Sequence, residues 1–394
     1  MPDNRSVARR PGLAVVLAAT VLTVTAGFLL KLPCASGEWG DERQYRRLCY
    51  SDVVPLYSGR GIDGGQVPYV EADNEYPVLT GMAMWVGGLP ARSYAGFFAW
   101  TAALLTAGAL VAAWALYRMA GPRALFFATA PTLGLYAFMN WDLIAVALAT
   151  AGMLAFLRER DRAAGVLLGL GAAAKLYPAL LVVPFALSRL RDGRRAGAVR
   201  LAAWAAVAWA AVNLPFLVAF PERWSEFLRF SSTRPADWDS LWLMTQRYLG
   251  FPLSTGVVNV VSAVAFVAAA AGLWWAGSRR PGFRPWTFGF PLLVVFLLSS
   301  KVYSPQFSLW LLPWFAVALP EPRLFVAFSL ADVAVFVSRF RWFGEIESEP
   351  LPSPAFQIAL LLRAAVLVAC VVVWLRRQGD EPEAMPRAAE AVPA

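Results

Sequence analysis

Long apolar blocks recur along the chain from Gly12 to Leu375, separated by polar connections of very different lengths. A helix needs about 20 mostly apolar residues to cross a bilayer. The pattern therefore predicts an all-α polytopic membrane protein with about 12 transmembrane helices. We expect the spans near residues 12–32, 94–117, 123–139, 142–157, 163–176, 177–190, 198–219, 253–277, 284–300, 303–319, 322–338 and 355–375.

The apolar block at 163–190 is the hardest to assign. It is interrupted by Lys175, Tyr177 and Pro178 and is too short for two full spans. We predict a short hairpin that enters and leaves from the same side. If the block were one span, the basic cluster that follows it would move to the outer face and every later loop would be inverted.

The basic residues indicate the orientation, because Lys and Arg accumulate in short cytoplasmic loops. With a cytoplasmic N-terminus (1–11), alternation places every strongly basic short loop on the cytoplasmic side: Arg118 and Arg123; Arg158, Arg160 and Arg162; Arg189, Arg191, Arg194 and Arg195; Arg279, Arg280 and Arg284; and Arg376 and Arg377. We interpret the first block as a retained helix and not as a signal peptide.

This orientation divides the chain into a membrane body at 12–375 and a polar, cytoplasmic tail at 376–394 that we expect to be disordered. Three long loops then face outward: a long first extracytoplasmic loop at 33–93, and further outer loops at 220–252 and 339–354. Both termini are cytoplasmic in this prediction. We expect any catalytic site at the outer face of the plasma membrane, because the predicted cytoplasmic loops are short and their shared feature is basic residues.

Composition narrows the chemistry. Of the 394 residues, 59% are hydrophobic and 15% are charged, whereas soluble domains have about 25% charged residues. Histidine is absent and only three cysteines are present, which excludes His-based triads, His-metal sites and zinc clusters. A general base must therefore be a carboxylate. The net charge of +9 comes from scattered arginines that form no continuous basic face, so we expect no nucleic acid partner.

Lysine is rare in this chain. The only three are Lys31, Lys175 and Lys301, and the last two stand in the similar contexts KLY and KVY at predicted outer helix ends. A cation at that position can pair with a lipid phosphate. The alternative is a snorkelling side chain or an ordinary salt bridge.

The first outer loop alternates acids with tyrosines and prolines. Its acids include Asp52, Glu71, Asp73 and Glu75, and its tyrosines include Tyr57 and Tyr76. The alternative is an ordinary solvated surface loop, which would also be acidic. Solvation alone does not require acids to alternate so closely with tyrosines and prolines. The apolar stretch at 78–90 that ends the loop is too short to span and should lie at the interface.

Two further outer segments carry polar clusters. Asn140 and Asp142 flank a tryptophan where the third span returns into the fourth, and Asp142 could equally be a helix N-cap. Asp237 and Asp239 form a D-x-D pair beside Arg234, which is weak evidence for a metal site, and we expect none.

Two residue pairs are predicted to be in contact. Cys34 and Cys49 both lie in the first outer loop, where oxidation is permitted, and either form a disulfide or are unrelated thiols. Asp332 and Arg363 are the ionised residues inside spans without an obvious route to water. Such charges are costly and usually face a partner, and at about 1.5 Å per residue they lie at similar depth, so we predict that they pair.

Several motifs together resemble a known family. CYSDVVPLY and NEYPVLTG lie in the first outer loop, NWD lies at the second outer turn, and GLGAAAKLYPALLVVP and SSKVYSPQFSLWLLP follow. Their order and spacing, from about residue 10 to residue 375, resemble the actinobacterial membrane glycosyltransferases of family 87. These belong to the GT-C superfamily and include polyprenol-phosphate-mannose-dependent mannosyltransferases and related arabinofuranosyltransferases.

The resemblance implies a GT-C type fold, an active site at the outer membrane face, and a polyprenyl-phosphate sugar as donor, with no cofactor. It also implies that the catalytic carboxylate lies in the first outer loop, which we assign to Asp52, with Glu75, Asp73 and Glu71 as rivals. Mannose is preferred over arabinofuranose on the resemblance alone, and the acceptor would be a cell-envelope glycan or glycolipid.

The remaining site residues complete this hypothesis. An inverting displacement needs one carboxylate as general base and cations for the leaving phosphate, for which we nominate Lys175, Lys301 and Arg234. The nominated substrate contacts are Tyr57, Tyr76, Asn140, Asp142, Tyr177, Tyr303 and Gln306. The alternatives are a flippase of lipid-linked sugars, with a polar pathway through Asp332, Arg363 and Lys175, and a non-catalytic envelope assembly subunit.

Overall fold

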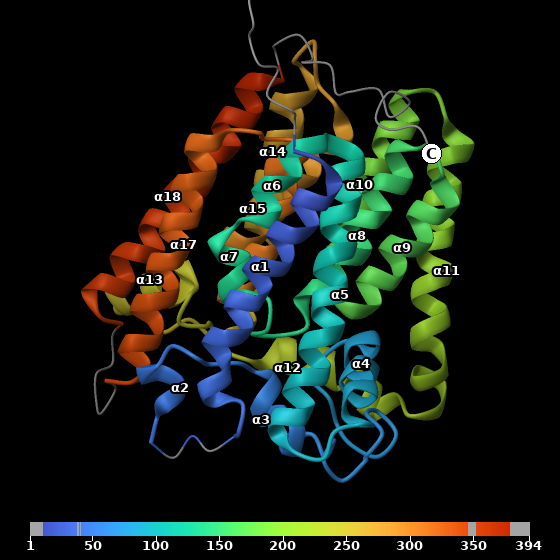
Figure 1. Ribbon diagram of the computed structural model, residues 1–394. Coiled ribbons are helices and arrows are strands. Elements are labelled where there is room, and N and C mark those ends of the chain that lie inside the picture. The colour runs from blue at the N-terminus through green and yellow to red at the C-terminus, as the bar shows by residue number, and fades with distance from the viewer. Residues whose placement is uncertain (1–10, 38, 40, 346–351, 379–394) are drawn as a thin grey trace, which may run out of the picture.

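The computed structural model describes residues 11–37, 39, 41–345 and 352–378, and within these ranges the chain is helical and has no strand (Figure 1). The expectations for the N-terminus at 1–11 and the tail at 376–394 fall almost wholly outside the described residues, as does part of the predicted loop at 339–354. Nothing in the described ranges tests the expectations for the two termini.

Six long helices form most of the bundle: α1 (Leu13–Lys31), α5 (Tyr94–Ala120), α11 (Arg195–Ala219), α14 (Thr255–Ser278), α17 (Pro322–Phe343) and α18 (Pro354–Arg377). Shorter apolar helices complete it: α8 (Asp142–Leu157), α9 (Asp161–Ala174), α10 (Tyr177–Arg191) and α15 (Gly289–Ser299). Five of the described helical segments are long and apolar enough to cross a membrane. The prediction of an all-α polytopic membrane protein is confirmed, whereas the count of 12 spans stays a prediction.

Two of the predicted spans are not continuous helices. The segment at 123–139 is broken into α6 (Leu125–Ala128) and α7 (Pro131–Tyr136), because Ala130 precedes a proline and adopts an extended backbone. The segment at 303–319 is a 3₁₀ helix, η4 (Pro305–Trp310), followed by α16 (Leu312–Val317). The second broken segment is almost wholly buried, so protein partners replace lipid around its interrupted backbone. The first is mostly buried, although Thr129 and Pro131 are exposed at its break.

The chain reverses direction between α9 and α10. Asp161, the first residue of α9, forms a buried ion pair with Arg189 in the last turn of α10, with 2.7 Å between Oδ1 and Nε. The two helices are therefore antiparallel, as the predicted hairpin requires. The break falls at Lys175, whose backbone is extended, and Pro178 lies in the first turn of α10.

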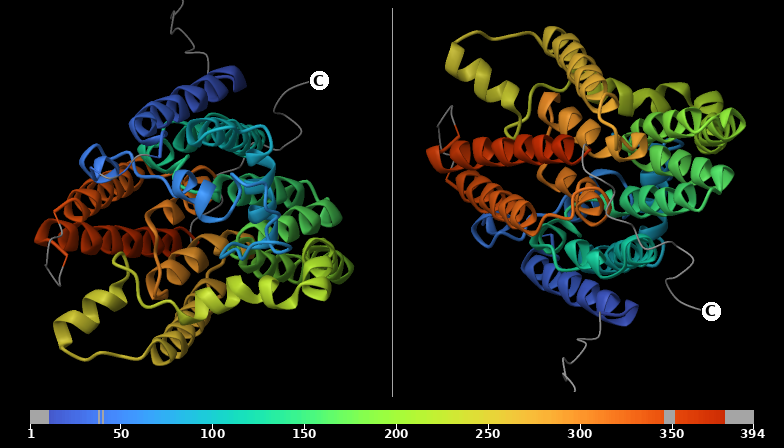
Figure 2. Two further views of the ribbon diagram at one scale, coloured as in Figure 1. Left: turned by 90° about the horizontal axis from the view of Figure 1, so that it is seen from below. Right: turned by 90° about the horizontal axis from the view of Figure 1, so that it is seen from above.

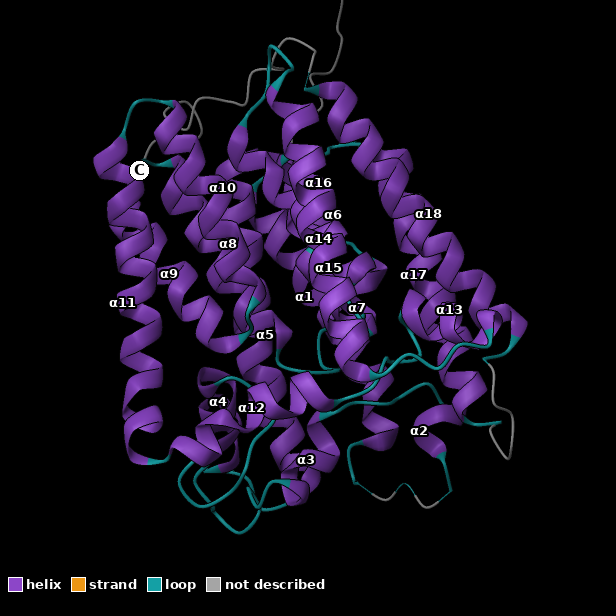
Figure 3. Cartoon of the chain, turned by 180° about the vertical axis from the view of Figure 1, so that it is seen from behind, coloured by secondary structure: helices purple, strands orange, loops and turns teal. Residues whose placement is uncertain are grey.

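The two ends of the bundle differ in construction. At the lower end in Figure 1 the short helices α2 (Arg43–Arg46), α3 (Val53–Gly59), α4 (Val78–Gly88) and α12 (Pro221–Thr233) gather, and α13 (Leu241–Leu249) follows α12 in the chain. Figure 3 shows the same gathering from behind. α1 begins and α18 ends at the opposite end, where the connections are short.

The periphery is covered by α1 and α14, which lie on opposite sides of the bundle (Figure 2). α14 exposes Val260, Val264, Val267 and Trp275, as expected for a surface in contact with lipid. The interior is formed around α5, α8, η4 and α16, and is rich in aromatic side chains. This interior supports the loops that position the polar cluster described next.

Candidate active site

A cavity of about 470 Å³ lies where the interrupted helices and the loops of the lower end meet. Most of its lining comes from positions where a helix starts, ends or breaks. Of the residues nominated from the sequence, nine line it: Asp52, Glu75, Tyr76, Asn140, Lys175, Tyr177, Arg234, Lys301 and Gln306. The first and last of these residues, Asp52 and Gln306, are more than 250 positions apart in the chain, and the fold brings them together.

Asp52 is fixed by the segment that precedes α8. Its backbone N–H donates to the Met139 carbonyl at 2.8 Å, and the neighbouring Ser51 hydroxyl donates to the Phe138 carbonyl at 2.6 Å. The Ser51 hydroxyl also accepts from the N–H of Val53 at the start of α3. Asp52 makes no side-chain cap bond to this helix, so its carboxylate is left to face the cavity.

Two neutral groups donate to this carboxylate. The Tyr50 hydroxyl donates to Oδ1 at 2.7 Å, and the Asn140 amide donates to Oδ2 at 2.8 Å and to the Tyr76 hydroxyl at 2.7 Å. The negative charge of Asp52 and burial raise the pKa of Tyr50 well above its usual range. Burial, together with the charges of Asp52 and Glu75, does the same to the pKa of Tyr76. Both phenols therefore stay protonated and uncharged. Tyr50 contacts the carboxylate directly, and Tyr76 contacts the Asn140 amide that donates to it.

Lys175 lies on another wall of the cavity. Its ammonium group is 3.3 Å from Oδ2 of Asp142, and it lies over the rings of Tyr76 at 5.4 Å and Phe307 at 5.1 Å. Asp142 is fully buried and accepts a second bond from the Trp310 indole N–H at 2.7 Å. Asp142 does not line the cavity and contacts Lys175 from behind the wall. Its expected role as a substrate contact stays a prediction.

A second cationic group comes from the turn after α15 and the end of α12. The Lys301 ammonium donates to the Ser232 carbonyl at 3.1 Å, and the Lys301 carbonyl accepts from the Asp237 N–H at 2.8 Å. Arg234 forms an ion pair with Asp237 at 3.0 Å. Burial lowers the pKa of Lys301, and the nearby positive charge of Arg234 lowers it further.

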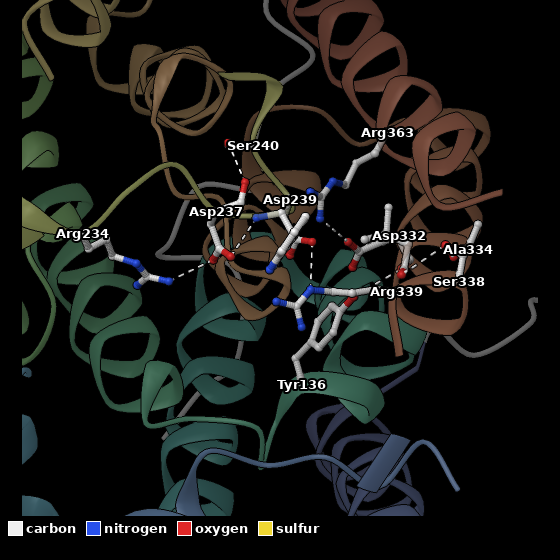
Figure 4. A network of polar contacts seen from close by, with 12 residues as sticks. Tyr136, Arg234, Asp237, Asp239, Ser240, Asp332, Ala334, Ser338, Arg339 and Arg363 are labelled. Carbon is white, nitrogen blue, oxygen red and sulfur yellow. Dashed lines mark hydrogen bonds and ion pairs between the residues drawn. The ribbon is translucent and has the colours of Figure 1, made fainter. Parts of the chain in front are cut away.

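Behind this wall a chain of ion pairs runs into the bundle (Figure 4). Arg339, which lines the cavity, pairs with Asp239 at 2.9 Å. Burial raises the pKa of Asp239 to about 6, against the opposing effect of the Arg339 charge. Deeper, Arg363 approaches Asp332 at 3.6 Å and lies 3.8 Å from the centre of the Tyr303 ring. The structure thus brings together the two intramembrane charges that the sequence suggested would pair.

The D-x-D pair does not act as a unit. Asp237 turns toward Arg234 and Asp239 toward Arg339, so each carboxylate is engaged by a different arginine. No cluster of three or more potential metal-ligating residues occurs in the part of the chain that the structure describes.

The other candidate acids of the first outer loop interact with partners outside the Asp52 cluster. Glu75 lines the cavity but is paired with Arg60 at 2.5 Å. The Glu71 carboxylate accepts from the Val67 N–H within its own loop, and the largely exposed Asp73 lies 3.9 Å from Arg223. Neither Glu71 nor Asp73 lines the cavity, which separates both from Asp52.

Two of the nominated substrate contacts lie outside the cavity. Tyr57 is buried against Phe97, with the ring centroids 4.8 Å apart, and Tyr303 is buried beneath Arg363. Both rings pack in the interior, and their expected role as substrate contacts stays a prediction. Cys34 and Cys49 form a disulfide in the structure, which ties the end of α1 to the residue before Tyr50.

Other cavity residues were not nominated from the sequence. Tyr50 precedes Asp52 by two positions, and this spacing alone does not show that the phenol turns toward the carboxylate. Arg339 was assigned to an outer loop, but it lies in the last turns of α17. Phe227 and Phe230 of α12 supply an apolar wall, for which the amphipathic pattern of that helix was the available signal.

The bundle and its cavity define a polytopic membrane protein with one cluster of carboxylates, cations and aromatic rings at the loop-rich end. Residues 76–305, more than half of the chain, match the model of glycosyltransferase family 87. The chain belongs to this family and is a membrane glycosyltransferase, as the motifs suggested. Asp52 and the disulfide precede the matched region, so their assignment rests on the geometry above.

Two crystal structures of ArnT from Cupriavidus metallidurans are similar to the chain. The structure bound to undecaprenyl phosphate has 14% sequence identity and a TM-score of 0.44, covering 92% of this chain and 77% of that chain. The structure in the apo state has 15% identity and a TM-score of 0.43, covering 93% of this chain and 76% of that chain. No curated protein sequence matches this one significantly.

Proposed function

We propose that this glycosyltransferase moves a hexose, mannose as the first candidate, from a polyprenyl-phosphate donor to a cell-envelope glycan or glycolipid. Transfer takes place at the outer face of the plasma membrane, inverts the anomeric centre, and uses Asp52 as general base. The proposal needs neither a cofactor nor a metal ion, because protein cations supply the positive charge.

One observation carries this proposal. Three carboxylates line the cavity, and two of them are neutralised: Glu75 by Arg60 and Asp237 by Arg234. In the described part of the chain, Asp52 forms no ion pair and accepts only from the neutral Tyr50 and Asn140. A carboxylate that is not engaged in an ion pair is available to accept a proton from a substrate hydroxyl.

The reaction follows from this arrangement. Asp52 accepts the proton of the acceptor hydroxyl while that oxygen attacks the anomeric carbon from the face opposite the phosphate. The bond between the anomeric carbon and the phosphate oxygen breaks, and its electron pair leaves with the polyprenyl phosphate. Lys301, Lys175 and Arg234 stabilise this leaving group. A phosphate is a weak base, so no general acid is required.

The lipid-linked donor is supported by the composition of the walls. Phe227, Phe230, Phe296 and Leu176 line the same cavity as the cations, so an isoprenoid chain and its phosphate would each find matching surroundings. Outside the cell no nucleotide sugar is supplied, and a donor must then be reachable from the bilayer. The outer orientation rests on the arginines in the short connections, and mannose rests on the family resemblance.

The test uses membranes containing the full-length protein, a polyprenyl-phosphate mannose labelled in the sugar, and an acceptor extract. We expect label in the acceptor fraction and an equal amount of released polyprenyl phosphate. Asp52→Asn should lower the rate by about 10² to 10⁴, the range that general-base catalysis contributes, without loss of protein from the membrane. Movement of the labelled lipid across the bilayer without transfer would instead support the flippase.

A matched control is available in the same loop. Asp63 is exposed and, among the described residues, its carboxylate accepts only from the Gly64 N–H in a surface turn, so Asp63→Asn should keep the wild-type rate. Full activity of Asp52→Asn would move the base to Glu75, the other first-loop acid that reaches the cavity.

A further inference from the structure

Arg339 is a cation in the wall of the cavity that has no role in the mechanism above. It lies in the last turns of α17, and its side chain is 12% exposed. Its Nε donates to Oδ1 of Asp239 at 2.9 Å, and the guanidinium makes no other hydrogen bond among the described residues. A guanidinium has five N–H donors. Arg339 therefore keeps the donors of both Nη groups for a molecule in the cavity.

The guanidinium of Arg339 is held in place before any substrate arrives. Asp239, which is buried, binds one edge of it. The guanidinium carbon also lies 5.1 Å from the centre of the Phe340 ring and 4.5 Å from the centre of the Phe343 ring. Contacts of this kind attract an arginine and restrict its rotation. A ligand that binds here pays little for ordering the side chain.

Arg339 lies on the same side of the cavity as Asp52. The Phe340 ring that contacts its guanidinium also stacks on the Tyr50 ring, with the centroids 5.1 Å apart. The Tyr50 hydroxyl in turn donates to Oδ1 of Asp52 at 2.7 Å. One aromatic ring therefore separates the free donors of Arg339 from the tyrosine that contacts the proposed base.

The cations proposed for the donor phosphate lie elsewhere. Figure 4 shows Arg234 and Arg339 on opposite sides of the segment that carries Asp237 and Asp239. Lys301 donates to a carbonyl two residues before Arg234. In an inverting displacement the attacking oxygen and the leaving phosphate lie on opposite faces of the anomeric carbon. A group on the side of the base is consequently placed to contact the acceptor.

The charges around Arg339 favour a neutral ligand. Asp239 already offsets the charge of the guanidinium, and Asp52 adds a negative charge on the same side of the cavity. An anionic group here would meet no uncompensated cation and would be repelled by Asp52. Hydroxyl oxygens accept hydrogen bonds without carrying charge, and two adjacent hydroxyls of a sugar ring can accept from the two Nη groups at once.

We propose that Arg339 is an acceptor-binding residue, whose Nη groups donate to adjacent hydroxyls of a neutral sugar and thereby present its reacting hydroxyl to Asp52. This inference rests on the proposed transferase activity and deepens it, because it names the class of acceptor at the point of attack: a neutral, polyhydroxylated ring. Removal of the guanidinium should weaken the binding of the acceptor and not that of the donor.

The experiment separates this contact from the ion pair that supports it. Arg339→Gln alone leaves Asp239 buried without a cation, so the main variant is Asp239→Asn with Arg339→Gln, which removes both charges together. Asp239→Asn alone keeps the guanidinium, and the asparagine oxygen can still accept from Nε. Arg341→Gln is the control, because Arg341 is exposed on the same helix.

Transfer is measured in membranes with labelled polyprenyl-phosphate mannose and the acceptor extract, each varied while the other saturates. The double variant should raise the acceptor KM by about tenfold or more, as expected for a lost hydrogen bond to a charged group, with the donor KM nearly unchanged. Asp239→Asn should raise the acceptor KM less, and Arg341→Gln should not raise it. Arg339→Lys should not restore acceptor binding, because lysine lacks the planar pair of donors.

Three outcomes would overturn the inference. A raised donor KM would make Arg339 a donor contact. Equal acceptor KM values in Asp239→Asn and the double variant would reduce Arg339 to a partner of Asp239. Full rescue by Arg339→Lys, or a wild-type acceptor KM that rises with salt, would indicate an anionic acceptor group.

Thermal unfolding gives a measurement that does not depend on transfer. A bound acceptor stabilises the folded protein, so the extract should raise the unfolding midpoint of the wild type more than that of the double variant. If mannose were not transferred but this difference remained, the proposed donor would fail and the acceptor contact would stand. An equal shift in both proteins, or no shift in the wild type, would count against Arg339. The midpoints without extract confirm that each variant folds.

Discussion

At the residue scale, the site is distinguished by which charges are already neutralised. Glu75, Asp237 and Lys175 line the cavity, and each has a partner of opposite charge, whereas Asp52 and Lys301 have none in the described ranges. Asp52 accepts only from neutral groups, and Lys301 donates to a backbone carbonyl. These two side chains are free to respond to a substrate, one as a base and the other as a phosphate contact.

Removing the Lys301 charge should weaken donor binding more than removing the Lys175 charge, because Asp142 already offsets Lys175. A hydrogen bond to a charged group contributes about 1.5–3 kcal/mol, so Lys301→Met should raise the donor KM by about tenfold or more. Steady-state kinetics with varied donor test this. Equal effects of Lys301→Met and Lys175→Met would contradict the ranking, with thermal unfolding of both variants as the control.

The same residue predicts a pH dependence. Burial lowers the pKa of Lys301, so its charge is present at low pH and is lost as the pH rises through that lowered value. The donor KM should therefore rise at a lower alkaline pH than an ordinary lysine would give, and Lys301→Arg should abolish this rise because arginine keeps its charge.

At the scale of elements, interrupted helices create the cavity. Continuous spans would place their termini at the membrane surface, whereas the break after α9 and the 3₁₀ turn of η4 set Lys175 and Gln306 into the wall. The first outer loop is held on this wall by bonds from the Ser51 hydroxyl and the Asp52 N–H to the segment before α8, and by the disulfide to the turn after α1.

Loss of the Cys34–Cys49 disulfide should therefore reduce both stability and transfer. The bridge closes a loop with a sequence separation of 15 residues, for which chain entropy gives about 3 kcal/mol. Cys34→Ser with Cys49→Ser should lower the thermal unfolding midpoint and the transfer rate together, because Tyr50 and Asp52 follow directly after the bridge. Cys370→Ser is the control, since Cys370 is a buried free thiol. A wild-type midpoint and rate in the double variant would show that the bridge is dispensable.

At the scale of the whole molecule, the bundle has two unlike ends. The loops, short helices and cavity are at one end, and the basic connections are at the other, where Arg189 and Asp161 join α10 to α9. This polarity is the reason for proposing an extracytoplasmic active site.

Single exposed cysteines should label from opposite sides of intact cells. The native cysteines form a disulfide or are buried, so an introduced thiol dominates the signal. A membrane-impermeant maleimide should modify Asp73→Cys in the first outer loop and leave Arg162→Cys unmodified until the cells are opened. The reverse pattern would place the cavity on the cytoplasmic side and exclude the proposed orientation.

The sequence by itself determined the class of fold, because apolar blocks of membrane length have few other stable arrangements. It also narrowed the inventory of chemistry: histidine is absent, so we expected a carboxylate as the general base. Local motifs were sufficient to suggest the family, and most of the nominated polar residues line one cavity. The antiparallel α9–α10 hairpin was inferable because proline and lysine interrupt an otherwise apolar block.

Only the tertiary structure decided which charges are neutralised and which side chains reach the cavity. The four acids of the first loop are equivalent in type: Asp52, Glu71, Asp73 and Glu75. They differ in their partners, which lie far away in the sequence or across a turn of the same loop. Tyr57 and Tyr303 could not be separated from Tyr50 and Tyr76 for the same reason. Side-chain direction depends on long-range packing, and the acid and cation roles of this site depend on that packing.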